Sequence, residues 1–228
     1  MAFYPYRNWM LPVAAETCDE YLNDINGQHV SEQHVLAACD SASSGPVKEG
    51  NVGGGTGMIC YEFKGGTGTA SRRCTINGKT YTIGVLVQAN FGTRNDLNIR
   101  GVPVGRHLTN NTLWKTPTHP ATQGSIIAIA ITDAPLLPIQ VQRIARRIGL
   151  GVGRTGTPSE NGSGDIFLAL STGNDVCDKG QNAEANVRYV TQSQPAVALS
   201  RSRWWRMSLC RYQVNHPVVP GNRLGIRS

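Results

Sequence analysis

The stretch TQGSIIAIAI, residues 122–131, decides how the central part of the chain folds and where its chemistry lies. The apolar run from Ile126 to Ile131 is typical of a short buried β-strand. It places Ser125 at the N-terminal end of that strand, where a hydroxyl can be held rigidly and still be reached by a substrate. Gly-Ser is also a common turn, so on spacing alone the pair could simply be a turn that enters a core strand.

The glycine before the serine favours a chemical interpretation. Without a Cβ, Gly124 tolerates the strained backbone in which the Ser125 hydroxyl attacks the carbonyl on its own N-terminal side. Such an attack would split the chain between residues 124 and 125. It would leave Ser125 with a free α-amine, whose ordinary pKa of roughly 7.7 to 8 suits it to act as the base for its own hydroxyl.

Further blocks stand in a fixed order around this stretch. They are ET (16–17), LNDING (22–27), NVGGGTGM (51–58), FKGGTGTASR (63–72), VLVQANFG (85–92), TDAPLLP (132–138) and NGSGDIF (161–167). Taken together, they closely resemble the DmpA-type family of L-aminopeptidase D-Ala-esterase/amidases, which includes the β-peptidyl aminopeptidases. The resemblance covers roughly residues 8 to 175.

The resemblance implies a role for each of five residues. A precursor of this type cleaves itself at a Gly-Ser bond, and the new N-terminal serine, here Ser125, hydrolyses amides and esters. Ser163 and Asp165 match the Ser-Gly-Asp group beside the nucleophile. Asn90 matches the oxyanion donor, and Glu16 matches the carboxylate that holds the free amino group of the substrate. The implied substrates are short peptides, amino-acid amides or esters.

Each of these roles has a plain structural alternative. Asn90 stands at the end of an expected strand, where asparagine commonly caps a turn. Glu16 could be a solvated loop charge, the usual fate of glutamate. Ser163 and Asp165 could simply shape a turn through local side-chain bonds. The shared order of the motifs favours the functional interpretation in all three cases.

Some features depart from the family pattern. Members usually read Glu-Thr-Tyr-Asp-Gly where this chain has Glu16-Thr17-Cys18-Asp19-Glu20. That tyrosine donates to the oxyanion, and the Cys18 thiol is a much weaker donor; Tyr21 could substitute for it. Members also carry more chain before the segment that matches Trp9, so we expect a truncated N-terminus. One alternative function is therefore a catalytically impaired, truncated remnant that acts as a folded or binding domain.

A second alternative is an acyltransferase that resembles the ornithine acetyltransferases, which share the fold. Those enzymes use an N-terminal threonine, and Ser125 argues against this assignment. For either enzyme the implied fold is α/β, a layered αββα sandwich of the N-terminal-nucleophile type. The resemblance also implies a homo-oligomer.

The charge of the chain is concentrated at its C-terminal end. Residues 201–228 carry six Lys and Arg and no Asp or Glu, so they hold +6 of the net charge of +7. They also lack the acidic, Ala-rich helix with which the family ends. We therefore expect a single hydrolase domain over residues 1–200 and a basic divergent tail over 201–228. The tail could bind nucleic acid or an anionic membrane surface, or it could simply be a disordered or loosely packed terminus. We favour the second interpretation and expect neither nucleic acid nor a membrane as a partner.

Composition excludes several other classes of protein. The chain has 228 residues of which 39% are hydrophobic, enough for one sizeable core. Its longest apolar run is far too short for a membrane span, and residues 1–7 do not resemble a signal peptide, so a cytoplasmic protein is expected. The six Cys include no Cys-x-x-Cys pair and the five His are scattered. We expect reduced cysteines, no metal and no cofactor.

One competing motif runs from Gly151 to Gly156 and satisfies Gly-x-Gly-x-x-Gly. It follows an expected helix rather than a strand, so a dinucleotide site is not predicted.

Helical spacing of apolar residues over 141–148 indicates that helix, with Asp133 as its cap, Pro135 and Pro138 in its first turns and Gly149 as its stop. Residues 80–88 and 166–171 read as further strands, and residues 32–39 as a short helix.

Overall fold

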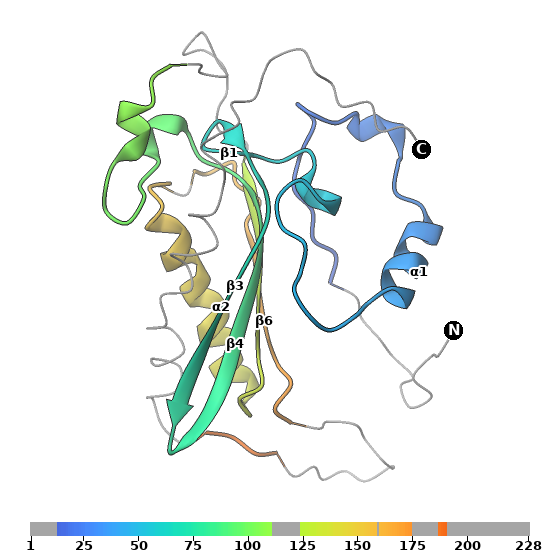
Figure 1. Ribbon diagram of the computed structural model, residues 1–228, viewed down its shortest axis with the longest axis vertical. Coiled ribbons are helices and arrows are strands. Elements are labelled where there is room, and N and C mark those ends of the chain that lie inside the picture. Colours follow the sequence, from blue (N-terminus) through green and yellow to red (C-terminus); the bar gives the residue numbers. More distant parts are fainter. Residues whose placement is uncertain (1–12, 111–123, 159, 175–186, 191–228) are drawn as a thin grey trace.

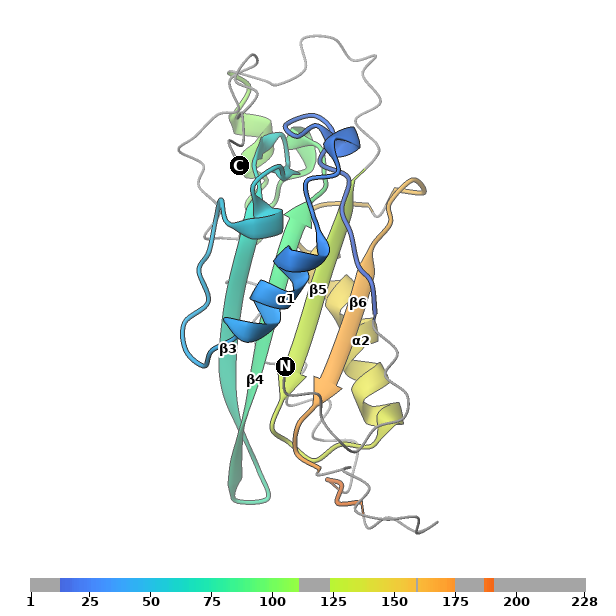
Figure 2. The ribbon, with the colours of Figure 1, turned by 90° about the vertical axis from the view of Figure 1, so that its right-hand side faces the viewer.

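The computed structural model describes residues 13–110, 124–158, 160–174 and 187–190. Its main feature is a four-stranded sheet in the order β3-β4-β5-β6, which Figure 2 shows from one face. The strands are β3 (Gly66–Ile76), β4 (Lys79–Asn90), β5 (Ser125–Thr132) and β6 (Ile166–Ser171). A two-stranded ribbon of β1 (Ile59–Cys60) and β2 (Phe63–Lys64) lies at one end of this sheet (Figure 1).

The first three long strands are antiparallel, and the last is parallel to its neighbour. β3 and β4 form a hairpin closed by Asn77 and Gly78, both with positive φ, which is the turn chemistry that Asn-Gly favours. β5 and β6 are parallel and are joined by the helix α2 (Pro138–Gly153). Because parallel strands start at the same edge of a sheet, the segment before β6 lies beside the start of β5.

The core lies between α2 and one face of the sheet. Alternate residues of each strand point to this face, and helix residues at i, i+4 and i+8 meet them. The cluster includes Ile83, Val85, Val87 and Ala89 of β4, Ile126, Ala128 and Ala130 of β5, and Ile144, Ile148 and Val152 of α2. Figure 1 shows α2 on this side of the sheet and α1 (Glu32–Asp40) on the other. No residue of α1 is buried.

The expected helix is present, but both of its boundaries were predicted wrongly. It begins at Pro138, a residue suited to the first turn. Asp133 does not cap it, because its Oδ1 accepts instead from the backbone N–H of Thr82, at 2.7 Å. The helix also continues past Gly149 to Gly153. A Cβ at Gly149 would lie 3.4 Å from the Phe167 ring, an ordinary contact, so the helix can pass this position whatever small residue it carries.

The remaining expected elements agree with the structure to within a few residues. The strand expected over 80–88 is β4, the strand expected over 166–171 is β6, and the helix expected over 32–39 is α1. The Gly151–Gly156 motif begins inside the last turn of α2, so it does not form a phosphate loop before a helix. Four short 3-10 helices, η1 (Ile25–Gly27), η2 (Gly53–Gly55), η3 (Arg94–Asp96) and η4 (Val104–His107), are among the described residues.

A strained hairpin stands between β1 and β2. Its two loop residues, Tyr61 and Glu62, have φ of +51° and +59°, a conformation that favours glycine or asparagine. Tyr61 is buried and its hydroxyl lies 2.5 Å from Oγ1 of Thr155. Glu62 contacts Arg94, whose guanidinium is buried over the ring of Phe63. These contacts compensate for the local strain, which costs of order 1 kcal/mol or more at each residue.

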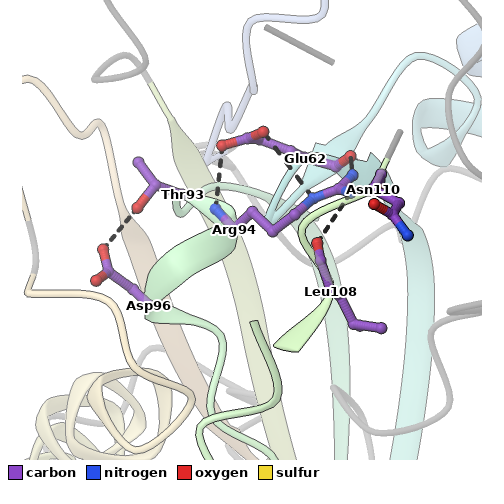
Figure 3. A network of polar contacts seen from close by, with 6 residues as sticks. All are labelled: Glu62, Thr93, Arg94, Asp96, Leu108 and Asn110. Carbon is purple, nitrogen blue, oxygen red and sulfur yellow. Dashed lines mark hydrogen bonds and ion pairs between the residues drawn. The ribbon is translucent and has the colours of Figure 1, made fainter. Parts of the chain in front are cut away.

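Arg94 ties this hairpin to the chain that follows β4 (Figure 3). Its Nη2 donates to the backbone oxygen of Glu62 at 2.7 Å, and its backbone N–H donates to Oε1 of the same residue at 3.1 Å. Its Nη1 donates to the carbonyl oxygens of Leu108 and Asn110. The guanidinium therefore holds together the hairpin and the last described residues before position 111.

Candidate active site

Three strand ends meet at the edge of the sheet where β5 begins. Ser125 is directly paired with Asn90, the last residue of β4. Ala89 and Ile126, the adjacent residues, lie in the core beneath α2. Since neighbouring side chains alternate between faces, the side chains of Asn90 and Ser125 share the opposite face. Both are only 7% exposed.

The expected partners of the serine lie beside it. Ile127 of β5 is in register with Ile166 of β6, so residues 163–165 flank the start of β5. A Cβ built on Gly164 would lie 3.9 Å from Cβ of Ser125. The hydroxyl of Ser163 donates to Oδ1 of Asp165 in a short hydrogen bond. The topology thus brings the predicted nucleophile, Asn90 and the Ser-Gly-Asp group together.

The Ser-Gly-Asp segment also shapes a turn, which is the plain structural role that the sequence left open for it. The backbone N–H of Ser163 donates to the Glu160 carbonyl at 3.0 Å, which closes a turn just before β6. A residue that shapes a turn can still orient a neighbouring hydroxyl. The two interpretations are therefore compatible, and the bonded Ser163 and Asp165 flank Gly164, the residue that lies beside Ser125.

The carboxamide of Asn90 is fixed at both ends. Its Oδ1 accepts from the backbone N–H of Ile59 at 2.8 Å, and its Nδ2 donates to the Cys18 carbonyl at 2.6 Å. The opposite rotamer of the amide would set donor against donor and acceptor against acceptor, so the network assigns the two atoms. An amide nitrogen carries two N–H donors. One of these is therefore left for an oxyanion.

The N-terminal segment contributes to the site through its backbone. Cys18 contacts Asn90 with its carbonyl, while its thiol is exposed. Thr17 donates from its hydroxyl to Sδ of Met58 at 3.0 Å, which ties the segment to the loop before β1. Glu16, the residue before Thr17, is exposed. The 40% exposed Tyr21 lies in the turn that follows; its role as a replacement donor stays a prediction.

The structure gives a further reason for a glycine at position 124. Its φ is not in the left-handed region, so a positive φ does not select glycine here. Instead, a Cβ at this position would lie 2.7 Å from Cα of Phe91 and 2.9 Å from the Asn90 carbonyl oxygen. Contacts with backbone atoms this short cannot be relieved by a side-chain rotation. Gly124 therefore lets the chain enter β5 directly beside the end of β4.

Sequence reasoning assigned no role to the backbone around residue 58. The Ile59 N–H, the Cys18 carbonyl and the Lys64 ammonium, which donates to the Met58 carbonyl at 2.9 Å, all belong to the site's hydrogen-bond network. Main-chain groups leave no signal in a motif. Lys64 did leave a signal, because it is a charged residue directly before the glycines of a glycine-rich stretch.

The described residues contain four free cysteines, of which Cys18 and Cys39 are exposed, Cys60 is buried and Cys74 is half-buried. Burial raises the pKa of the Cys60 thiol to about 12, which makes it inert near neutral pH.

Among the described residues, no three His, Cys, Asp or Glu side chains are grouped so that they could hold a metal ion. Cys177, Cys210 and the basic tail over 201–228 lie outside the described residues. No described helix is long and apolar enough to cross a membrane.

Comparison with known proteins identifies the family. Residues 5–202 match the model of Peptidase family S58. The chain is 54% identical over 176 residues to the β-peptidyl aminopeptidase BapA of Sphingosinicella microcystinivorans, covering 73% of this chain and 44% of that protein. It is 46% identical over 200 residues to the BapA of Sphingosinicella xenopeptidilytica, covering 84% of this chain and 50% of that protein.

A solved structure agrees with these relatives. The L-aminopeptidase D-Ala-esterase/amidase of Ochrobactrum anthropi, described as a prototype of the serine aminopeptidases and a variant of the Ntn hydrolase fold, superposes with a TM-score of 0.71 at 46% identity. The match covers 82% of this chain and 50% of that one. The chain spans about half the length of the relatives it matches.

These comparisons confirm the expected fold class, an α/β Ntn hydrolase fold, and they favour a hydrolase over an acyltransferase. The described residues supply one sheet of that fold, with α2 on one face. The chain belongs to Peptidase family S58, the family of the DmpA and BapA aminopeptidases.

Proposed function

We propose that this chain is a self-processing serine aminopeptidase with amidase and esterase activity. The observation that carries the proposal is the pairing of Ser125 with Asn90 at one sheet edge, with Gly164 beside the serine. This arrangement supplies a nucleophile, an oxyanion donor and a hydrogen-bonded Ser-Asp pair within one small region. The names of the relatives support a peptide substrate, including one with a β-amino acid.

In the proposed reaction, the hydroxyl of Ser125 attacks the carbonyl carbon of the substrate and its own α-amine takes the proton. That amine exists only after cleavage between Gly124 and Ser125. The free N–H of the Asn90 amide stabilises the oxyanion, a contribution of about 2.7 to 4 kcal/mol when one such donor is lost. The tetrahedral intermediate then collapses: its bond to the leaving amine or alcohol breaks, the protonated α-amine gives the proton to that group, and an acyl-serine ester remains. Water attacks this ester with the α-amine as its base, the bond to Oγ breaks to release the acid, and the proton returns to Ser125. Ser163 and Asp165 orient the amine and the hydroxyl.

Glu16 is proposed to select substrates with a free N-terminal amine. It is exposed, and the segment that carries it is held to the site through Thr17 and Cys18. A carboxylate that pairs with an ammonium forms a charge-assisted hydrogen bond, which is stronger than a neutral one. A homo-oligomeric assembly stays a prediction from the family resemblance.

The proposal is tested by hydrolysis of chromogenic anilides of L-alanine and β-alanine by the purified 228-residue chain. Both should be cleaved, while N-acetyl-alanine anilide, which has no ammonium, should not. Ser125→Ala should lower kcat roughly 10⁶-fold, the cost of losing a serine nucleophile. Ser71→Ala, at an exposed serine of β3, is the matched control and should leave the rate unchanged. Activity that survives Ser125→Ala would exclude Ser125 as the nucleophile.

A further inference from the structure

Lys64, at the end of β2, has no role in the reaction proposed above. Its Nζ donates to three carbonyl oxygens, those of Gly55 at 3.0 Å, Met58 at 2.9 Å and Gly65 at 2.9 Å. An ammonium group has three N–H donors, so these carbonyls satisfy all of them. The charge is half-buried and is surrounded by neutral acceptors rather than by a contacting carboxylate. Keeping a charge in such a place costs free energy, which suggests that the charge serves a purpose.

One of the three carbonyls is connected through hydrogen bonds to Asn90, the candidate oxyanion donor. The Met58 carbonyl, which accepts from Lys64 and also from the backbone N–H of Gly65 at 2.8 Å, belongs to the same peptide group as the Ile59 N–H. That N–H donates to Oδ1 of Asn90. The Asn90 amide then donates from Nδ2 to the Cys18 carbonyl, and its second Nδ2 hydrogen is the candidate oxyanion donor. A continuous chain of hydrogen bonds thus runs from Nζ of Lys64 to the Asn90 amide.

Hydrogen bonds in such a chain polarise one another. A positive charge at the Met58 oxygen makes the Ile59 N–H a stronger donor, which in turn draws electron density toward Oδ1 of Asn90 and makes its Nδ2 hydrogens more positive. Condensed-phase estimates of this strengthening are about 10 to 30% per bond. The same contacts also fix the position of the carboxamide, because the Met58–Ile59 peptide group cannot rotate while Lys64 and Gly65 both hold its oxygen.

We propose that Lys64 is a positioning residue for catalysis, which orients and polarises the Asn90 amide through the Met58–Ile59 peptide group. The kinetic part of this inference rests on the proposed function, in which Asn90 stabilises the oxyanion. The electronic part does not, because it concerns a hydrogen-bond chain that exists whether or not the protein hydrolyses a substrate.

The charge on Lys64 can be switched by pH. Burial lowers the pKa of its ammonium to about 8, and the Asp19 carboxylate on the N-terminal segment partly opposes this effect. Of the neighbouring elements, residues 50–58 carry no titratable side chain, Cys60 on β1 has a pKa of about 12, the hairpin carries Glu62, and the N-terminal segment carries the exposed Cys18 thiol besides Asp19. Raising the pH through 8 therefore removes the charge while Cys60 stays protonated.

The first experiment follows the ¹³C resonances of the Met58 carbonyl and of Cγ of Asn90 in the inactive Ser125→Ala variant, titrated across pH 8. Both should shift with one midpoint near 8, the pKa of Lys64. The shifts should vanish when Lys64→Met is added and persist with Lys79→Met, an exposed lysine of β4. A Met58 carbonyl that titrates while Cγ of Asn90 does not would overturn the proposal.

The second experiment measures kcat for the alanine anilide in a double-mutant cycle. Lys64→Met should lower kcat about tenfold, a fraction of the 10² to 10³ that the loss of a whole oxyanion donor costs. In an Asn90→Ala background the same change should cost less than about twofold, because the amide it acts on is gone. A purely structural brace would cost the same factor in both backgrounds, and that result would overturn the proposal.

Lys64→Arg covers the case in which Lys64→Met does not fold. Arginine stays charged throughout this range, so the ¹³C resonances of Met58 and Asn90 in the Lys64→Arg variant should not shift across pH 8. A midpoint near 8 that persists in Lys64→Arg would overturn the proposal. An inactive wild-type chain would count against the proposed function alone, since the titration decides the role of Lys64 independently.

Discussion

At the scale of single residues, the site depends on close backbone approach as much as on side-chain chemistry. Gly124 illustrates this, because its missing Cβ makes room for the backbone of Phe91 and Asn90. The sequence indicated that glycine was needed before Ser125, but it suggested strain rather than crowding. Crowding could not be predicted, because it arises from the pairing of two strands that are far apart in the chain.

Gly124→Ala should destabilise the uncleaved chain. The new Cβ would lie 2.7 Å from Cα of Phe91, and overpacking of this kind costs about 1 to 3 kcal/mol. Urea unfolding in the Ser125→Ala background, where the chain cannot use Ser125 to cleave itself, measures the effect. Gly84→Ala, at a β4 glycine with nothing within 4 Å of a new Cβ, is the control and should change stability little. Equal effects at the two glycines would contradict the crowding argument.

Asn90 shows what can and cannot be predicted for a site residue. Its motif and its place at the end of an apolar strand were visible in the sequence, and the structure pairs it with Ser125. Its fixed orientation was not visible, because the two groups that hold it are the main chains of Ile59 and Cys18. At position 18 the carbonyl makes this contact, which any residue type could supply.

At the scale of elements, hydrophobic periodicity predicted β4, β5, β6 and α2 because each has a clear apolar run or stripe. β3 was not predicted as a strand. Its buried positions are filled by Gly66, Gly68, Ala70 and Ile76, and the first three carry too little apolar area to produce a pattern. The parallel pairing of β5 with β6 explains the site most directly, since it brings residues 163–165 to the start of β5.

Arg94→Met should destabilise the β1–β2 hairpin and with it the whole domain. The change would leave the carboxylate of Glu62, whose side chain is 15% exposed, without its cation, while the positive φ at Tyr61 and Glu62 remains. Removing one partner of a buried pair costs about 3 to 5 kcal/mol. Urea unfolding followed by circular dichroism should show a loss of that order. Arg73→Met, at an exposed position of β3, should change stability by less than about 0.5 kcal/mol.

At the scale of the whole molecule, the fold turns three distant parts of the chain into one site. Residues 16–19, the β1–β2 ribbon and the ends of the long strands contact one another through Asn90, Met58 and Lys64. The family resemblance predicted the fold class and the peptidase family, because ordered motifs carry that information. It could not predict the Lys64 contacts, because they join a side chain to carbonyls whose positions only the folded loop defines.

Ser125 is proposed to cleave its own chain and then to serve as the nucleophile. The most direct test is the intact mass of the purified 228-residue protein, with N-terminal sequencing of its fragments. We expect two fragments, the second beginning Ser125-Ile126-Ile127. The Ser125→Ala variant should remain whole, and Ser71→Ala should be cleaved like the wild type. A wild-type chain that stays whole after long incubation, or a Ser125→Ala variant that is still cut at this bond, would contradict this proposal.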